Sequence, residues 1–373
     1  TMSKCKVGYL GVFRDGTGFS HAAIHTALAL DAVGVDVACR NIKLATQVVE
    51  PPQRITELCQ KSTEGVTHVI QHILAPYFTY VAGAKNIGYF YTETTHFRPS
   101  SWQYNANLMD EIWVSSDDNK KACRDSGVTV PISVVDIPCD PRLFDRDKTG
   151  KLKVPTDGRY AFYHIGDYSS RKNTYNLIKC FLEEFSRDDN VILILKSYVE
   201  GVSAEDSNKM ILQDIATLKQ SLRKGKLDNY PPIVVIGDYL SSEDVLKLHA
   251  TCNCFVTLER GAAWNLPAFE AAAMGNWVIC NGWGGQKKFL GDTINANLVR
   301  YYMDSVHGMI RTPYQTIYTA HEKWAEPDYA QFKEYMREAY RTNLKPSEHA
   351  RRRLASLFTY ERVGAELKEL LHV

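Results

Sequence analysis

Residues 254–280 read CFVTLERGAAWNLPAFEAAAMGNWVIC, and this stretch decides the fold. The apolar run at 254–258 is typical of a buried strand, and a second apolar run follows at 277–280. Between them a polar loop leads into an alanine-rich helix, which we expect to begin near Pro267 and to end at Gly275. Strand, loop, helix and strand in this order predict one βαβ unit of a parallel sheet.

The same alternation extends outward over almost the whole chain. In the N-terminal half we expect strands at 6–12, 35–39, 68–72, 87–91, 111–115 and 132–137, with a helix at 20–33. In the C-terminal half we expect strands at 159–165, 191–196 and 233–236, and helices at 174–185, 209–223 and 241–250. From 322 onward the pattern is mostly helical. This order predicts an α/β protein whose parallel sheets are covered by helices on both faces.

A linker divides the chain into two predicted domains. The segment 138–157 contains three prolines and several charges, and it has little periodicity. A chain of 373 residues is long for one domain and suits two. We therefore expect a first domain at 1–145 and a second domain at 146–357.

The composition is that of a soluble protein and indicates the cytoplasm. Hydrophobic residues make up 45% of the chain, and none of the apolar runs reaches the roughly 18–20 residues that span a bilayer. The start of the chain resembles a first strand more than a signal peptide. The nine cysteines include no CxxC pair, so we expect reduced thiols, with a disulfide framework or zinc site as the alternative.

Charge and acidic spacing limit the ligands that the chain is expected to bind. A net charge of +1 argues weakly against a protein that binds nucleic acid by neutralising phosphates. The alternative of a local basic groove that binds nucleic acid stays open. The pairs Asp117-Asp118 and Asp188-Asp189 lack the spacing of a DxD-type metal motif and read as solvated residues. We expect no metal and no cofactor.

The quoted stretch also carries candidate chemistry. The exposed amides at a helix N-terminus near Pro267 suit a diphosphate. Glu270, expected in the first turn of that helix, can accept two hydrogen bonds from ribose hydroxyls. The alternative is that Glu270 only complements the helix dipole.

The stretch resembles the donor-site motif of glycosyltransferase family 4, E-G-F-G-L-P-x-x-E-A-M-A-x-G-x-P-V-I. The matching positions are Leu266-Pro267, Glu270-Ala271, Gly275 and Val278-Ile279. The first Glu of the pattern falls on Ala262, and its F-G pair falls on Trp264-Asn265. The resemblance implies that Asn265, Leu266 and Glu270 bind the donor, with Glu270 on the nucleotide ribose. The contacts to the donor sugar stay open, and Glu259 is an alternative to the missing Glu.

Two further segments resemble the same family, in the same order along the chain. His164-Ile165-Gly166-Asp167-Tyr168-Ser169-Ser170-Arg171-Lys172-Asn173 matches the pattern G-R-x-x-x-x-K-G through Gly166 and Lys172, with Asp167 in place of the Arg. Arg171 is expected to supply the missing charge, and the two cations to stabilise a departing diphosphate. Val234–Leu240 resembles the strand and turn that precede the base pocket, so Tyr239 and Leu240 are expected to meet the base. The alternatives are a solvated basic pair and an ordinary βα turn.

The N-terminal half contributes weaker candidates. Gly16 and Gly18 follow the first strand, where the family has a glycine-rich loop that faces the donor phosphates; the spacing does not extend to GxGxxG, which argues against a dinucleotide site. Glu93 and His96 follow the strand at 87–91 and are candidates to orient the acceptor or contact the donor sugar. Tyr91 and Trp102 are expected as walls of the acceptor side. The alternative is a helix N-cap cluster at Thr94 or Thr95.

Taken over nearly the whole chain, the resemblance implies the GT-B architecture, two Rossmann-like domains that face each other across a cleft. Phe358-Thr359-Tyr360-Glu361 resembles the segment before the last helix, so residues 358–373 are expected to pack back on the first domain. The implied activity is a retaining, metal-independent hexosyl- or pentosyltransferase that uses a nucleotide-sugar donor and a hydroxyl acceptor. Two alternatives stay open: the same chemistry on a modified nucleic-acid base, and a nucleotide-sugar-binding protein without activity.

Overall fold

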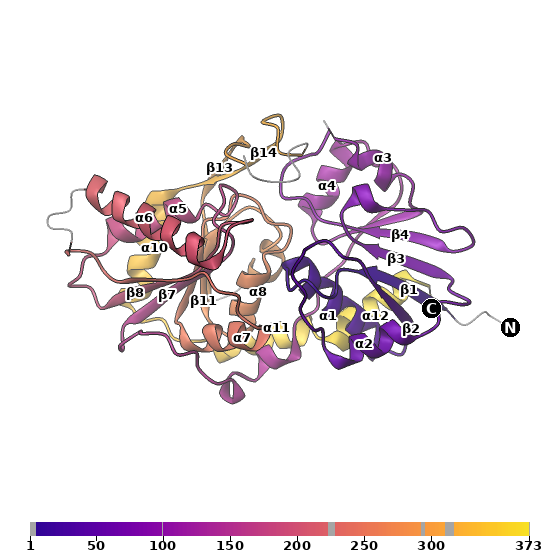
Figure 1. Ribbon diagram of the computed structural model, residues 1–373, viewed down its shortest axis with the longest axis horizontal. Helices are drawn as coiled ribbons and strands as arrows, with labels where there is room; N and C mark the ends of the chain where they lie inside the picture. The colour runs from indigo at the N-terminus through magenta and orange to yellow at the C-terminus, as the bar shows by residue number, and fades with distance from the viewer. Residues whose placement is uncertain (1–4, 99, 223–227, 292–294, 310–316, 373) are drawn as a thin grey trace. The chain divides into compact units, whose positions relative to one another are not determined.

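The computed structural model describes all residues except 1–4, 99, 223–227, 292–294, 310–316 and 373 (Figure 1). The chain forms two compact units. Unit 1 consists of Thr1–Pro141 together with Ala355–Val373, and unit 2 consists of Arg142–Leu354. The division falls between residues 141 and 142, inside the segment predicted as a linker.

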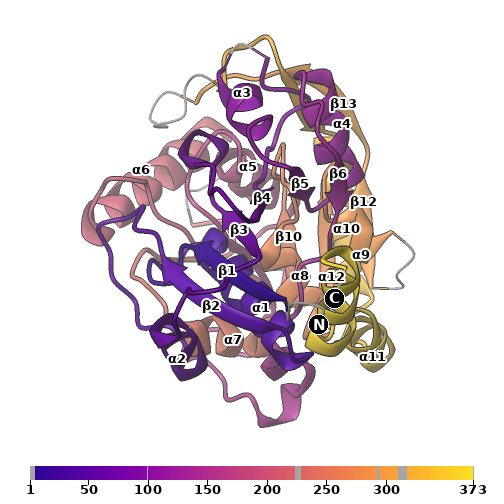
Figure 2. The ribbon, with the colours of Figure 1, turned by 90° about the vertical axis from the view of Figure 1, so that its right-hand side faces the viewer.

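Unit 1 is built on a six-stranded sheet in the order β2-β1-β3-β4-β5-β6, with every neighbouring pair parallel (Figure 2). Its strands are β1 (Lys6–Gly11), β2 (Asp36–Asn41), β3 (His68–His72), β4 (Lys85–Tyr89), β5 (Glu111–Val114) and β6 (Ile132–Val134). The helices that flank the sheet are α1 (Gly18–Ala32), α2 (Gln53–Gln60), α3 (Trp102–Ala106), α4 (Asp117–Asp125) and α12 (Tyr360–Leu370).

The last helix of the chain packs on the first helix of unit 1 (Figure 2). A Cβ atom added at Gly364 of α12 would lie 2.3 Å from the backbone oxygen of Ala29 in α1, so glycine permits this close approach. Tyr360 and His25 join the same two helices through a hydrogen bond of 2.6 Å. The C-terminal helix therefore belongs to unit 1, although its residues lie far from the rest of the unit in sequence.

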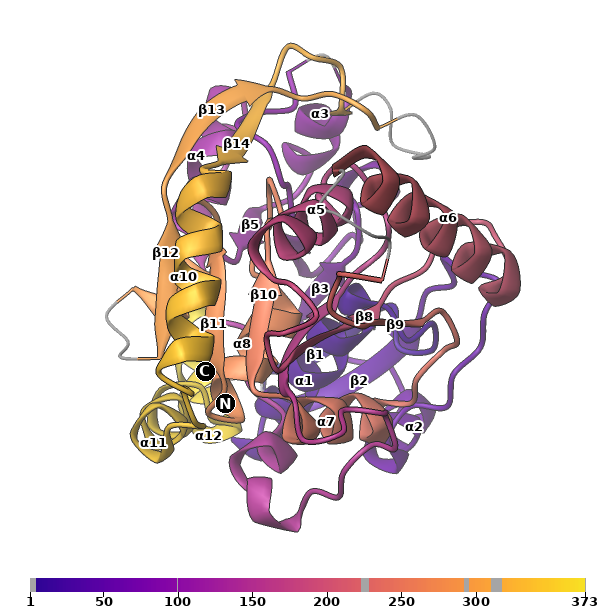
Figure 3. The same ribbon diagram turned by 90° about the vertical axis from the view of Figure 1, so that its left-hand side faces the viewer.

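Unit 2 repeats the architecture with the strand order β12-β11-β10-β7-β8-β9, again all parallel (Figure 3). Its strands are β7 (Tyr160–Ile165), β8 (Val191–Lys196), β9 (Ile233–Ile236), β10 (Cys254–Thr257), β11 (Trp277–Asn281) and β12 (Ala296–Val299). The helices are α5 (Thr174–Glu184), α6 (Ala204–Leu222), α7 (Ser242–Thr251), α8 (Leu266–Ala273), α9 (Lys287–Leu290), α10 (Tyr329–Arg341) and α11 (Glu348–Leu357). The predicted class, two Rossmann-like domains of parallel sheets flanked by helices, is confirmed.

The sequence missed the hairpin formed by β13 (Tyr301–Ser305) and β14 (Lys323–Pro327), which pair antiparallel. The prediction of mostly helical structure from 322 onward is therefore wrong at its start. Short 3-10 helices at Pro141–Phe144 and Arg146–Lys148 lie within the predicted linker. In the part of the chain that the structure describes, no helix is long and apolar enough to cross a membrane.

Candidate active site

Three loops of unit 2 follow strands of one parallel sheet and therefore emerge at the same edge. They follow β7, β9 and β10 and cover residues 166–173, 237–241 and 258–265. In open α/β sheets, ligands bind at this carboxyl edge. All the predicted donor-binding residues of the C-terminal half lie in these loops or in the helix α8 (Leu266–Ala273) that follows the last of them.

The loops after β7 and β10 meet at one carboxylate. Lys172 donates from Nζ to Oε1 of Glu259 at 2.8 Å, and the Arg171 guanidinium donates to the same oxygen. Arg171 also donates to the backbone oxygen of Gly261 at 2.9 Å. The Glu259 side chain is only 3% exposed, while those of Lys172 and Arg171 are 13% and 17% exposed. The structure thus brings the two predicted cations together and rejects the alternative of a solvated basic pair.

Gly166 leaves room for the Lys172 side chain. A Cβ atom added at Gly166 would lie 3.3 Å from Cδ of Lys172 and 3.1 Å from Nε2 of His164. The neighbouring Asp167, which replaces the Arg of the family pattern, faces the same cations. Its burial by itself would raise the pKa of the carboxyl group, but Arg171 and Lys172 outweigh this effect and hold the pKa below its usual range.

Arg260 stabilises the loop that carries Arg171 and Lys172, a role that was not predicted from the sequence. Its backbone N–H donates to the backbone oxygen of Arg171 at 2.8 Å, and its Nη1 donates to that of Ser170 at 2.6 Å. Its Nε donates to Oε2 of Glu326 on β14 at 2.6 Å. The Arg260–Glu326 pair therefore joins the β13–β14 hairpin to the loop that carries Arg171 and Lys172.

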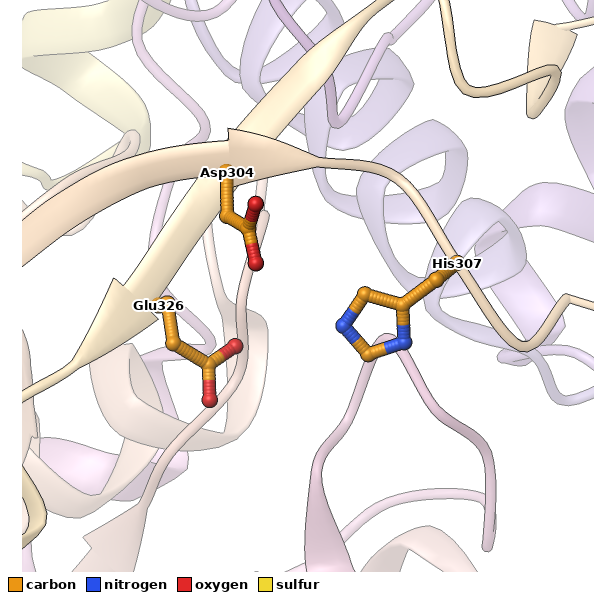
Figure 4. A group of neighbouring side chains, drawn as sticks. All are labelled: Asp304, His307 and Glu326. Carbon is orange, nitrogen blue, oxygen red and sulfur yellow. The ribbon is translucent and has the colours of Figure 1, made fainter.

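Asp304, His307 and Glu326 form a cluster on this hairpin whose candidate metal-ligand atoms lie within 4.8 Å of one another (Figure 4). Glu326 already accepts hydrogen bonds from Arg260 on both oxygens, and from the Tyr329 hydroxyl on Oε1. The positive charge of Arg260 opposes a second cation at this carboxylate. Glu326 therefore acts first as the partner of Arg260 described above.

Helix α8 begins at Leu266, one residue before the predicted start. Its N-cap is Asn265, whose side chain accepts a hydrogen bond from the backbone N–H of Ala268 at 3.3 Å. The prediction that Glu270 lies in the first turn is wrong, because that turn contains no acidic residue. The helix dipole acts mainly within the first turn, so complementing the dipole is a poor explanation for Glu270.

The Glu270 carboxylate is held by a buried histidine. Oε2 of Glu270 lies 3.2 Å from Nε2 of His249, which belongs to α7. The His249 side chain is fully buried, and that of Glu270 is 16% exposed. His249 was not predicted as a site residue, because in the sequence it reads as an ordinary apolar-face position near the end of a helix.

Two asparagines stand where the family pattern has glycine, and both have backbone angles that asparagine adopts at lower cost than most residues with a side chain. Asn173 and Asn265 have φ angles of 58° and 70°, in the left-handed region. Asparagine adopts this region more readily than other residues with a side chain. Their positions correspond to the final glycines of K-G and F-G in the two sequence patterns.

The loop after β9 presents an exposed tyrosine. Tyr239 is 52% exposed and lies with Leu240 between β9 and α7, whose N-cap is Ser241. In the neighbouring strand, Lys196 pairs in register with Ile236, and its ammonium lies 5.1 Å from the ring centre of Tyr198. Burial lowers the pKa of Lys196. This cation at the same sheet edge was missed by the sequence analysis, because it reads as the last residue of an apolar strand.

In unit 1, the predicted glycines form the tight turn from β1 to α1. Gly16 has a φ of 70°, and Gly18 is the first residue of α1 after the N-cap Thr17. Thr17 donates from its N–H and its hydroxyl to Asp15 Oδ1, at 3.0 Å and 2.7 Å. A carboxylate in this turn disfavours direct contact with a phosphate at the same point.

Glu93 and His96 lie in the loop after β4. Asn119 fixes the start of this loop, because its side chain accepts from the Thr92 N–H at 3.0 Å and donates to the Thr92 oxygen at 2.9 Å. The alternative of a helix N-cap at Thr94 or Thr95 is wrong, since the next helix is α3, which begins at Trp102.

The two predicted acceptor walls are part of the unit 1 core. Trp102 is 3% exposed and packs against Phe90 and Phe97. The Tyr91 hydroxyl bonds to Nε2 of His72 at 2.7 Å. Both rings are therefore buried in unit 1, and their predicted place as walls of the acceptor side stays a prediction. Burial lowers the pKa of His72 to about 3.

Solved structures share this architecture along the whole chain. Sucrose-phosphate synthase from Thermosynechococcus elongatus matches with a TM-score of 0.65 and 13% identity, over 99% of this chain and 98% of that chain. Anabaena HepE in complex with UDP and glucose matches with a TM-score of 0.63 and 13% identity, over 99% of both chains. A glycosyltransferase from Rickettsia africae matches with a TM-score of 0.63 and 14% identity, over 98% and 97%.

The fold is that of the GT-B glycosyltransferases. At these identities the likeness shows the fold and does not assign a family. The sequence matches no known family model, and no curated protein matches it.

Proposed function

We propose that the chain is a glycosyltransferase that moves a hexosyl or pentosyl group from a nucleotide sugar to a hydroxyl acceptor. The observation that carries the proposal is the meeting of Lys172 and Arg171 at the same sheet edge as Glu270. This places two cations for a diphosphate and one carboxylate for a ribose on loops of one domain. The relative HepE was solved with UDP and glucose.

Each part of the nucleotide-sugar donor is assigned to proposed residues of the chain. Lys172 and Arg171 stabilise the charge on the departing diphosphate, and the backbone amides at Asn265 and Leu266 add hydrogen bonds at the start of α8. Glu270 accepts from the ribose hydroxyls. Tyr239 and Leu240 meet the base, while Gly166 keeps the Lys172 side chain in place.

The proposed reaction proceeds with retention and without a metal ion. Two cations beside the leaving group offset its charge, which is the task that a divalent ion performs in metal-dependent transferases. Gly16 and Gly18 are proposed to contact the donor away from its phosphates, because the Asp15 carboxylate disfavours a phosphate at their turn. Glu93 and His96 are proposed to contact the acceptor or the donor sugar. The proposed acceptor is a hydroxyl group of a glycan, a lipid or another compound.

We also propose that the protein works in the cytoplasm. Seven of the nine cysteines are buried. Burial raises the pKa of several of these thiols, including those of Cys39, Cys252 and Cys280, which disfavours the reactive thiolate. Such thiols suit a reducing compartment.

A panel of nucleotide sugars in a thermal-shift assay tests the proposal. The correct donor is expected to raise the melting temperature and to be hydrolysed or transferred, and Glu270→Ala and Lys172→Ala are expected to lose both effects. Glu205→Ala, which removes an exposed carboxylate on α6, is the control and should behave as wild type. Normal binding and turnover by both site variants would show that the site is misplaced.

The same panel separates the alternatives. Stabilisation without sugar release or transfer would identify a binding protein without activity. Transfer to DNA with hydroxylated bases, but not to sugars or lipids, would identify a nucleic-acid acceptor. Failure of every nucleotide sugar to stabilise the wild-type protein would overturn the proposed function.

A further inference from the structure

A chain of hydrogen bonds runs through the core of unit 2 and ends on Glu270. Arg146 Nη1 lies 2.7 Å from Oδ1 of Asn276, and Nδ2 of Asn276 lies 2.7 Å from the Tyr163 hydroxyl. That hydroxyl lies 2.6 Å from Nδ1 of His249, and Nε2 of His249 lies 3.2 Å from Oε2 of Glu270. The members come from four separate parts of the sequence.

The direction of the first two bonds is fixed by chemistry. A guanidinium can only donate, so the Asn276 oxygen must face Arg146. The Asn276 amide nitrogen then faces the other way, where it donates to the Tyr163 hydroxyl and to the backbone oxygen of His249, each at 2.7 Å. Both of these groups can accept, so the amide orientation is consistent on both sides.

The direction of the remaining bonds follows from the first two. The Tyr163 oxygen accepts from Asn276, and its single hydrogen is left for Nδ1 of His249. Burial raises the pKa of Tyr163 well above its usual value, so the hydroxyl keeps this hydrogen. Nδ1 must therefore carry a lone pair, and the ring proton sits on Nε2, where it donates to Glu270.

We propose that His249 is a positioning residue for the nucleotide. Its Nε2–H, fixed in place by the chain from Arg146, holds the Glu270 carboxylate in the orientation that accepts the ribose hydroxyls. The inference rests on the proposed function, since it assigns a partner to Glu270. His249 itself does not touch the ligand, because its side chain is fully buried.

The contact with His249 restricts the rotation of the Glu270 side chain. A glutamate on a helix surface has several rotamers, and ordering it on binding reduces affinity. A hydrogen bond from a buried N–H to a carboxylate is charge-assisted and stronger than a neutral bond. Glu270 is therefore ordered before the nucleotide arrives.

Two substitutions of the same histidine separate positioning from general packing. His249→Gln places an amide N–H near the position of Nε2 and keeps a donor toward Glu270. His249→Asn keeps a polar group near Nδ1 and loses the donor. Isothermal titration with UDP, GDP and ADP, and with their 2′,3′-dideoxy counterparts, measures how much each variant depends on the ribose hydroxyls.

The wild-type protein is expected to bind its preferred ribonucleotide more tightly than the dideoxy form. His249→Asn should lose about tenfold of the affinity for the ribonucleotide and none for the dideoxy form, and His249→Gln should recover most of the loss. Adding His249→Asn to Glu270→Gln should cause little further loss, because the two residues act as one unit. Equal losses for both nucleotide forms would show a structural role and overturn the inference.

Histidine tautomers give a second measurement that needs no ligand. In protein labelled with ¹⁵N-histidine, the spectrum of His249 is expected to show an unprotonated Nδ1 and a protonated Nε2. A protonated Nδ1, as in the other tautomer or the imidazolium, would overturn the inference.

The two proposals fail in different ways. If the wild-type protein prefers ribonucleotides and His249→Asn keeps this preference, the inference is wrong and the proposed function stands. If no nucleotide of the panel binds, the proposed function is wrong, and the tautomer still shows whether the chain has the stated direction.

Discussion

Replacing Glu259 by glutamine is the sharpest perturbation of the candidate site. Glu259 forms ion pairs with Lys172, at 2.8 Å, and with Arg171. These are the two cations that a bound diphosphate would need. The substitution keeps the shape of the side chain and removes its charge. We expect the variant to bind UDP or another nucleoside diphosphate more tightly, and to be less stable without it.

The size of the gain follows from distances in the site. A phosphate oxygen in hydrogen-bond contact with Lys172 would lie roughly 5–6 Å from the carboxylate, about twice a hydrogen-bond length. Two unit charges at that separation repel by about 3 kcal/mol at an effective dielectric constant of about 20. Solvent at the open side of the loop weakens this repulsion, so we expect a gain of about 1.4 kcal/mol, or about tenfold in affinity.

The loss of stability has the opposite sign. Removing one partner of a fully buried ion pair costs about 3–5 kcal/mol, and the cations here retain some exposure and an amide oxygen, so about 1–2 kcal/mol is expected. In a domain of this size each kcal/mol corresponds to about 2–4 °C in melting temperature. Glu259→Gln should therefore melt several degrees lower alone and show a larger rise with ligand.

Calorimetric titration and thermal shifts with UDP, UDP-glucose and pyrophosphate measure both effects. Glu205→Gln is the control, because Glu205 lies on α6 with a side chain 79% exposed. Unchanged or weaker binding of UDP and pyrophosphate would refute the argument that Glu259 competes with the diphosphate. A loss confined to UDP-glucose would instead show that Glu259 contacts the donor sugar, as the alternative to the motif glutamate missing at Ala262 requires.

Three further outcomes are expected. Lys172→Met should lower the affinity for UDP by about 30-fold, roughly 2 kcal/mol, but leave uridine binding unchanged, as measured by titration. Gly275→Ala should lower the free energy of unfolding in urea by about 2 kcal/mol, because φ is 88° and the new Cβ atom would lie 2.8 Å from the Ser347 oxygen. Burial lowers the pKa of His72 to about 3 and that of His164 to about 4. As the pH falls below about 6.5, these two histidines therefore take up protons in the unfolded chain but not in the folded chain. Stability should drop from there toward pH 4, with a shallower slope in His72→Phe; an equal slope would exclude His72 as a cause.

The central strands of both sheets could be predicted because they are buried on both faces. Such strands often read as continuous apolar runs, as β8 does, and the inner strands β3 and β8 have the bounds that the sequence predicts. The edge strand β9 is only half-buried, but its short apolar run was predicted with the same bounds. The strands β12, β13 and β14 lie at an edge or in a hairpin and mix polar with apolar residues. Their pairing partners, which are distant in sequence, decide their conformation.

The candidate site divides in a similar way. Lys172, Arg171 and Glu270 could be found because each stands at a fixed distance from a strand end or a helix start. His249, Arg260 and Glu326 act through packing between elements that lie far apart in sequence. No local pattern marks them, and the same residue types on another helix face would be ordinary surface or core positions.

The departure from the family pattern at Asp167 changes the electrostatics of the site. The pattern provides two cations at this loop, whereas here the two positive charges of Arg171 and Lys172 are balanced by the two negative charges of Asp167 and Glu259. A site with no net charge attracts an anionic donor weakly from a distance. Recognition of the diphosphate must then depend on short-range contacts, made when the cations turn from Glu259 to the phosphates. Screening acts mostly on long-range attraction, so nucleotide affinity should depend only weakly on salt.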